Sequence, residues 1–349
     1  MSVEAAELLA HAEVLLEDRQ IVEAEVAFYR AEESGADPDR CAGGRWMTAM
    51  LRGDFSAAWY ESDQIRKRGT PDEHRFWQGE DIVGKRVIVR CLHGFGDAVQ
   101  FLRYAPRLQA VASSLIVEVN PRMMELARCI YGVNEVITWD DAAPSSPPEW
   151  DVQVEVMELP YLFRTKIEQL PLETNYIRIP NAIAKRVTGI LGKRKKPRVG
   201  MVWSCGEWNL SRSVPFEYLR AILEESGCEF WNLQGGEVRS QAYGALCDAP
   251  DICDGDLLCL AGVVSQLDLL ITVDTLAPHL AGAMDIPAWV MVQHAADWRW
   301  MMSRNDSPWY PSLRLFRQPK QGDWEPVITD VQRALRQWIS RQHYGAKAA

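Results

Sequence analysis

The chain has 349 residues, which is too long for one ordinary domain and fits two or three. Its net charge of −10 argues against a nucleic-acid partner, since proteins that bind the phosphate backbone usually carry a basic excess. The charge is uneven: the first 80 residues contain 17 acidic and only 9 basic residues, so we expect them to form a separate unit.

Composition also bears on location and metal content. No segment has the roughly 20 consecutive apolar residues that a membrane-spanning helix needs. The start of the chain is acidic, whereas a signal peptide starts with positive charge. The sequence therefore predicts a cytoplasmic protein. The eight cysteines form no Cys-x-x-Cys pair, so we expect reduced thiols and no metal. We also expect no cofactor.

Residues 3–34 are predicted to form two amphipathic helices with a break near residues 18–20. Their apolar stripes consist of Leu8, Ala12 and Leu15, and of Ala24, Phe28 and Ala31. A second helical pair is predicted from about Arg45 to Lys67. The small–aromatic–small pattern before Gly35–Pro38 resembles half of a tetratricopeptide repeat. Such a short module, residues 1–80, is expected to be a cap or a docking arm.

From Lys85 onward short strands alternate with helices, which predicts α/β domains with parallel sheets. Expected strands are 86–92, 114–119, 135–138, 152–156, 198–203, 229–233, 267–273 and 288–292. Expected helices are 97–110, 122–131, 216–225, 257–266, 276–283 and 325–341. A loop is expected at 144–148.

A domain boundary is predicted within residues 181–198, whose basic run 193–198 is interpreted mainly as a solvated linker and otherwise as a surface for an anionic acceptor or membrane. The predicted domains are therefore 81–185 and 186–349. Open α/β sheets bind ligands at the carboxyl ends of their strands, so we expect a cleft between the two domains.

The first candidate site follows the strand at 86–92. Gly94 and Gly96 let a ligand approach the backbone, and the helix start beyond them offers unpaired N–H groups. Together with Glu118 they also suggest a dinucleotide-binding enzyme, although Val99 replaces the third glycine of that fingerprint. Asp97 is either a catalytic carboxylate or simply a residue favoured at helix starts.

The second candidate site follows the strand at 267–273. Thr275 and the N–H groups after it can bind a phosphate, next to Asp274 and with His279 on the same helix. The alternative is a capped helix in which His279 is a half-buried, hydrogen-bonded residue.

The third candidate site follows the strand at 198–203. Arg212 can bind a diphosphate through two hydrogen bonds, with Ser204 nearby in the chain. Ser213 is either part of this site or the N-cap of the next helix. Gln234, at the end of the following strand, completes the set of candidates.

Tryptophans gather near the C-terminus, at positions 289, 298, 300 and 309. Trp289 is expected to fill the core. Trp298 either fills the core or stacks on a base or sugar ring. Asp254-Gly-Asp256 looks like a metal-binding DxD motif, but is expected to be a loop before a helix.

These segments, in this order, resemble the bacterial glycosyltransferases related to lipopolysaccharide heptosyltransferases (family 9), in particular the subgroup with N-terminal tetratricopeptide-like repeats. The resemblance covers about residues 75–340. It rests on residues 93–104 (HGFGDAVQFLRY), 273–282 (VDTLAPHLAG), 297–300 (DWRW), 306–311 (DSPWYP), 317–318 and 322–324.

The resemblance implies a GT-B fold, in which two Rossmann-like domains face each other, and metal-independent transfer with inversion at the anomeric carbon. The acceptor lies on the N-terminal domain and the nucleotide-sugar donor on the C-terminal domain. Asp97 corresponds to the family's base. Thr275 and Arg212 are expected to stabilise the departing diphosphate. Two departures are Glu158, where serine is common, and a shorter stretch between Trp203 and Arg212.

Three functions remain open at this point. The first is a glycosyltransferase that acts on a surface glycan such as lipopolysaccharide core, with a lipid-linked acceptor and peripheral contact with the inner membrane face. The second is a protein O-glycosyltransferase that captures a polypeptide with its helical module. The third is a non-catalytic scaffold that retains the fold.

Overall fold

The computed structural model describes residues 2–69, 76–139, 149–242, 244, 246–248 and 255–348. The chain divides into two compact units. The helical unit comprises Met1–Gly79, Glu158–Leu170 and Ala295–Arg304, and the α/β unit comprises Glu80–Met157, Pro171–His294 and Asn305–Ala349. Each unit joins several stretches of chain, so the predicted boundaries at residues 80 and 185 stay predictions. The predicted loop at 144–148 lies outside the described residues.

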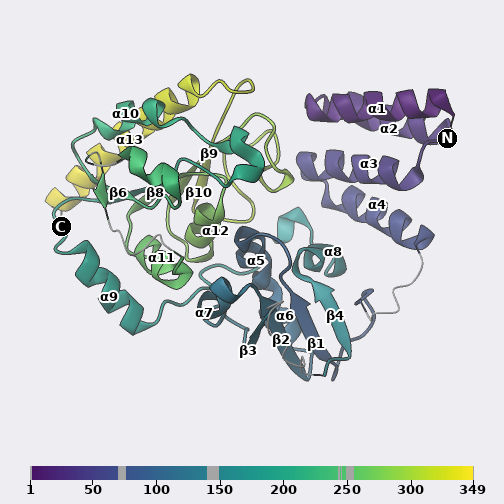
Figure 1. The fold of residues 1–349 in the computed structure, drawn as a ribbon, viewed down its shortest axis with the longest axis horizontal. Helices are drawn as coiled ribbons and strands as arrows, with labels where there is room; N and C mark the ends of the chain where they lie inside the picture. The colour runs from purple at the N-terminus through teal and green to yellow at the C-terminus, as the bar shows by residue number, and fades with distance from the viewer. Residues whose placement is uncertain are drawn as a thin grey trace. The chain divides into compact units, whose positions relative to one another are not determined.

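The helical unit begins with four α-helices arranged as two antiparallel hairpins (Figure 1). Their bounds are Val3–Glu17 (α1), Ile21–Glu33 (α2), Pro38–Arg52 (α3) and Phe55–Arg68 (α4). The first predicted pair and its break are confirmed. At the contact of α2 with α3, a Cβ on Gly44 would lie 2.2 Å from the Phe28 ring. The glycine therefore makes room for the aromatic residue of the repeat-like pattern.

The second hairpin begins earlier than predicted, at Pro38 instead of about Arg45. The Asp37 carboxylate accepts hydrogen bonds from the backbone N–H groups of Asp39 and Arg40, at 2.9 and 3.3 Å. Pro38 occupies the first helical position, where an N–H group is not needed. The stretch 35–38 thus ends α2 and also starts α3. The predicted start near Arg45 is too late because this stretch was interpreted only as the end of a helix.

A buried guanidinium joins three of these helices. Arg45 on α3 donates to both carboxylate oxygens of Glu61 on α4, at 2.8 and 2.9 Å, and to Glu32 on α2 at 2.6 Å. Arg45 and Glu61 are both buried. Such a pair fixes geometry more than it adds stability, because desolvation of the charges offsets much of their attraction.

Two later segments of the chain pack against the four helices. The first contains α8 (Leu159–Leu162), and the second contains the 3₁₀ turn η7 (Trp298–Trp300). The carbonyl of Thr165 accepts a hydrogen bond from Trp59 Nε1 at 2.8 Å. The ring of Trp298 meets that of Trp46 edge-on, with 5.7 Å between centroids. Part of the C-terminal tryptophan block therefore belongs to the helical unit.

The α/β unit contains two sheets whose described strands are all parallel (Figure 1). The first has the order β3-β2-β1-β4 and the second the order β10-β9-β8-β5-β6-β7. The strand bounds are Arg86–Arg90 (β1), Ser114–Val119 (β2), Glu135–Thr138 (β3), Val152–Glu155 (β4), Arg198–Met201 (β5), Glu229–Asn232 (β6), Cys247–Asp248 (β7), Leu269–Val273 (β8), Ala288–Val292 (β9) and Leu313–Arg317 (β10).

Most helices of this unit lie between consecutive strands. Their bounds are Phe95–Phe101 (α5), Ala105–Gln109 (α6), Met124–Ala127 (α7), Asn181–Leu191 (α9), Phe216–Leu223 (α10), Leu257–Val264 (α11), Leu276–Ala283 (α12) and Glu325–Ala348 (α13). Within the unit, α9 packs against α11 and α10 against α13. Across the described residues, no helix has both the length and the apolarity that crossing a bilayer demands.

The predicted boundary region 181–198 contains a helix that the sequence did not predict. Residues 181–191 form α9, whose Ile183 and Val187 contact Gly262 on α11. Arg198 lies buried at the start of β5, where it donates to the carbonyl of Gly192 at 2.7 Å. The rest of the basic run, residues 193–197, forms no helix or strand and is exposed or half-buried, in agreement with the predicted solvated linker. The short strands β7 and β10 were not predicted either, and the predicted helix at 122–131 is reduced to a 3₁₀ turn followed by α7.

Candidate functional site

The glycine loop after β1 leads directly into α5. Gly94 is the N-cap of this helix, and its backbone N–H donates to the Asp97 carboxylate at 3.0 Å. Asp97 therefore has the helix-capping role that was the simpler interpretation. Its side chain is half-buried. Its catalytic role stays a prediction.

Gly96 lies against α12 and the residue before it. A Cβ at this position would come within 2.8 Å of His279 Cδ2 on α12. The sequence predicted that this glycine lets a ligand approach the backbone. The structure adds a packing reason, because only a glycine lets α5 and α12 approach this closely.

The second candidate site begins where β8 ends. The Thr275 hydroxyl accepts from the backbone N–H of Ala277 at 3.3 Å, so Thr275 is the N-cap of α12. Asp274, just before it, forms an ion pair with Arg212, with 3.4 Å between Asp274 Oδ2 and Arg212 Nη1. Both side chains are largely buried. Two donor-binding candidates from different segments are therefore in contact.

The third candidate site is a loop held by side-chain hydrogen bonds. Gln234 Oε1 accepts from the backbone N–H groups of Trp203 and Ser204, both at 2.9 Å, and its Nε2 donates to the Ser204 carbonyl at 3.1 Å. The Ser213 hydroxyl accepts from the N–H of Cys205 at 3.1 Å. The N-cap of α10 is Pro215, so the alternative prediction that Ser213 caps this helix is wrong.

His279 lies buried on α12, with 3.1 Å between its Nδ1 and the hydroxyl oxygen of Tyr310. The ring of Tyr310 lies against the same helix, because a Cβ on Gly282 would meet that ring at 2.2 Å. His279 is thus the hydrogen-bonded residue of the simpler interpretation. Its place in a donor site stays a prediction.

Arg103 is the residue that sequence reasoning missed. It is fully buried and donates to the carbonyls of Gln100 at 2.8 Å and Trp309 at 2.7 Å. It also donates to the hydroxyl of Tyr176 at 3.3 Å. Its guanidinium carbon lies 4.5 Å from the centroid of the Tyr310 ring. Burial raises the pKa of the Tyr310 phenol well above its ordinary value.

The Arg103 cluster connects three of the sequence motifs. Residues 93–104, 273–282 and 306–311 meet through the contacts of Gly96 with His279, of His279 with Tyr310, and of Tyr310 with Arg103. A signal for Arg103 was present, since its neighbours Phe101, Leu102 and Tyr104 are all apolar or aromatic. An arginine in such a stretch is buried and needs partners.

Charged side chains end the strands of the first sheet. Arg90 donates to Glu118 at 2.5 Å and to Gln153 at 2.8 Å. The pKa of the adjacent Cys91 thiol is raised by burial and by the nearby carboxylates of Glu155, Glu118 and Asp97. Glu118 is thus held by Arg90 in this structure, which weakens its interpretation as a ribose-binding acid of a dinucleotide enzyme.

The remaining predictions fall elsewhere. Trp298 lies in the helical unit and is almost completely buried, where its ring contacts that of Trp46. Asp256 caps α11 by accepting from Cys259 N–H at 2.8 Å, while Asp254 lies outside the described residues. Among the residues that the structure describes, no group of three or more histidine, cysteine or acidic side chains could hold a metal ion.

The comparison by sequence gives one distant relative. No known family model matches the chain. The chain is 26% identical over 290 residues to the protein FlbA of Caulobacter vibrioides. The matched region is 76% of this chain and 48% of FlbA, so this chain spans about half the length of its curated relative.

The comparison by structure identifies the fold. A family 9 glycosyltransferase from Veillonella parvula matches with a TM-score of 0.55 and 13% identity, over 75% of this chain and 99% of that one. The ADP-heptose lipopolysaccharide heptosyltransferase II of E. coli matches with a TM-score of 0.57 and 12% identity, over 74% and 99%. The predicted fold class is confirmed: two parallel α/β sheets of the GT-B kind and an N-terminal four-helix region.

Proposed function

We propose that the chain is an inverting, metal-independent glycosyltransferase that moves a sugar from a nucleotide-sugar to a hydroxyl of a cell-surface glycan. The observation that carries this proposal is the contact between α5 and α12, where Gly96 meets His279. It brings the segment with Asp97, which follows β1, close to the segment with Asp274 and Thr275, which follows β8. In open α/β sheets, ligands bind at the carboxyl ends of the strands.

In this proposal Asp97 takes the proton from the acceptor hydroxyl as its oxygen attacks the anomeric carbon. The bond from that carbon to the nucleotide diphosphate breaks, and negative charge grows on the diphosphate. In the proposed scheme this charge is stabilised by the start of α12 with Thr275 and by the Arg212 guanidinium, which pairs with Asp274. These groups supply the positive potential themselves, so the scheme needs no metal ion.

A nucleotide panel tests this proposal. ADP, GDP, UDP and CMP are added separately to the full chain, and the melting temperature is measured by differential scanning fluorimetry. One of them is expected to stabilise the protein by about 2.7 kcal/mol at 100 times its dissociation constant. Stabilisation by none of the four would contradict the proposal and would favour the non-catalytic scaffold.

The Arg212→Ala variant is expected to weaken binding of the stabilising nucleotide roughly tenfold, because a charge-assisted hydrogen bond contributes about 1.5–3 kcal/mol. Isothermal titration calorimetry measures the dissociation constant. Arg220→Ala on α10 is the matched control, since its side chain is exposed and it is not among the candidates. An unchanged dissociation constant in Arg212→Ala would exclude this residue from the donor site.

A further inference from the structure

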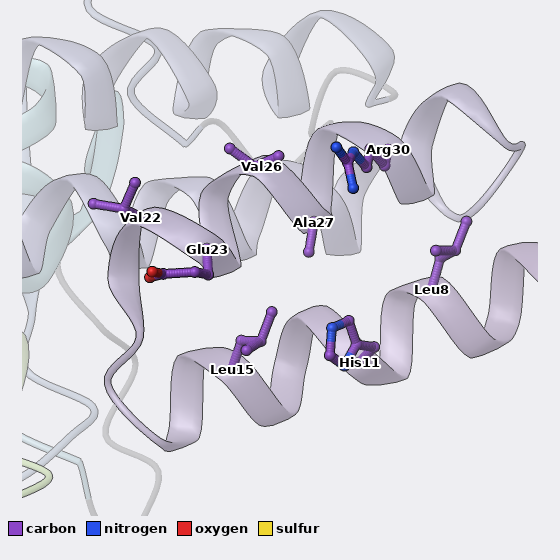
Figure 2. Close-up of a pocket in the computed structure, with 8 residues that line it drawn as sticks. All are labelled: Leu8, His11, Leu15, Val22, Glu23, Val26, Ala27 and Arg30. Atoms are coloured by element: carbon purple, nitrogen blue, oxygen red, sulfur yellow. The ribbon is translucent and has the colours of Figure 1, made fainter.

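An apolar pocket lies between α1 and α2 in the helical unit (Figure 2). Its volume is about 300 Å³. The side chains of Leu8, His11 and Leu15 project from α1 toward α2. The opposite wall comprises Val22, Glu23, Val26, Ala27 and Arg30 from α2.

The pocket continues into an apolar strip on α2. Val22 is 64% exposed and Val26 is 47% exposed, and their spacing of four residues puts them on the same face of the helix. An apolar face with a pocket of this size therefore indicates a surface that binds another molecule.

The charge around the pocket is strongly negative. Five acidic residues lie three, four or seven positions from residues that line the pocket, a spacing that puts them on the same side of the helix. They are Glu4, Glu7 and Asp18 along α1, and Glu23 and Glu33 on α2. All five are exposed, and none forms an ion pair with any residue that the structure describes. Two other acidic residues of α2 do form ion pairs, Glu25 with Arg52 and Glu32 with Arg45.

Few positive charges offset these carboxylates. Arg30 is the one arginine that lines the pocket. Arg19, at the turn between the two helices, directs its guanidinium to the carbonyls of Leu16 and Ala296. A second copy of the same face would place like charges opposite each other, which disfavours self-association.

We propose that this face of the first hairpin, α1 with α2, docks a basic amphipathic helix of a partner protein. The apolar side chains of such a helix, at positions i, i+3, i+4 and i+7, enter the groove between Leu8, Leu15, Val22 and Val26. Its flanking lysines or arginines meet Glu4, Glu7, Asp18, Glu23 and Glu33. The inference goes beyond the proposed transferase activity and does not depend on it.

The probe is a fluorescein-labelled synthetic helix of about 18 residues, with leucine at the i, i+3, i+4 and i+7 positions and lysine elsewhere. Fluorescence anisotropy measures its binding to the full chain. We expect saturable binding that weakens as salt increases, because charge complementarity contributes to it. Two comparison peptides, one with glutamate in place of lysine and one with the leucines scrambled off one face, are expected to bind at least tenfold more weakly.

Val26→Asp is expected to weaken binding of the basic probe at least tenfold, since a charge replaces an apolar contact within the groove. Val14→Asp is the matched control, because Val14 is exposed on α1 but does not line the pocket, and its affinity should stay within about twofold. Glu23→Lys changes only charge at an exposed position, and should weaken binding even if Val26→Asp disturbs the helix.

Several results would overturn this inference: no binding of the basic probe, equal binding of the scrambled peptide, or full affinity in both Val26→Asp and Glu23→Lys. Sedimentation velocity provides one more such result. If the chain forms a dimer and Val26→Asp dissociates it, the surface binds a second copy of the chain and not a partner helix. The nucleotide panel does not involve this hairpin, so failure of the docking surface is distinguishable from failure of the proposed reaction.

Discussion

Replacing Asp97 with asparagine is expected to lower the rate of sugar transfer by roughly 100-fold or more, with little change in nucleotide affinity. An asparagine amide cannot take up the proton of the acceptor hydroxyl, and a positioned general base contributes about 10²–10⁴-fold to such reactions. The substitution is mild in other respects. The amide oxygen can still accept the Gly94 N–H that Asp97 accepts at 3.0 Å, so the start of α5 should persist.

The measurement is the turnover number with the sugar donor of whichever nucleotide stabilises the chain, together with the dissociation constant of that nucleotide. Asp54→Asn is the matched control. Asp54 also caps a helix, by accepting from Ala57 N–H at 3.0 Å, but it lies in the helical unit. Turnover should fall only in Asp97→Asn. Equal turnover in the two variants would reduce Asp97 to a helix cap and remove it from the mechanism.

Much of the secondary structure of the α/β unit was predictable because its strands are short apolar runs bounded by turns. The predicted strands at 114–119, 135–138 and 288–292 agree with β2, β3 and β9 to the residue. The failures have local causes. The boundary interpretation of residues 181–198 missed α9, and the charged Arg314 interrupts the apolar pattern of β10. Strand β7 has only two residues, too few for any periodicity to be visible.

The candidate site was predictable only in part, because sequence patterns identify loops but not the partners that those loops meet. The glycine loop and the Asp274-Thr275 segment follow β1 and β8 as expected. Nothing in the pattern indicates that Gly96 lies against His279, 183 positions away, or that Arg212 bridges Asp274. Those contacts depend on how the two sheets pack, which is set by tertiary structure.

Replacing Arg103 with methionine is expected to lower the free energy of unfolding of the α/β unit by about 3 kcal/mol. Methionine retains most of the volume, but the carbonyls of Gln100 and Trp309 then lose the donors that reach them at 2.8 and 2.7 Å. Each buried acceptor left without a partner costs about 1–3 kcal/mol. The stacked cation over the Tyr310 ring, at 4.5 Å, is lost as well.

Differential scanning calorimetry measures this effect, and a loss of this size should lower the melting temperature by about 5–10 °C. Arg103→Lys should recover only part of it, because an ammonium lacks the planar set of donors that reaches two carbonyls and the Tyr176 hydroxyl together. Tyr310→Phe is the smaller change, since it removes the hydroxyl next to His279 while the ring stays under Arg103. It should cost about 1 kcal/mol. Wild-type stability in Arg103→Met would mean that an apolar side chain serves equally well here, as happens at some buried charges, and Arg103 would then not be needed to join the three motifs.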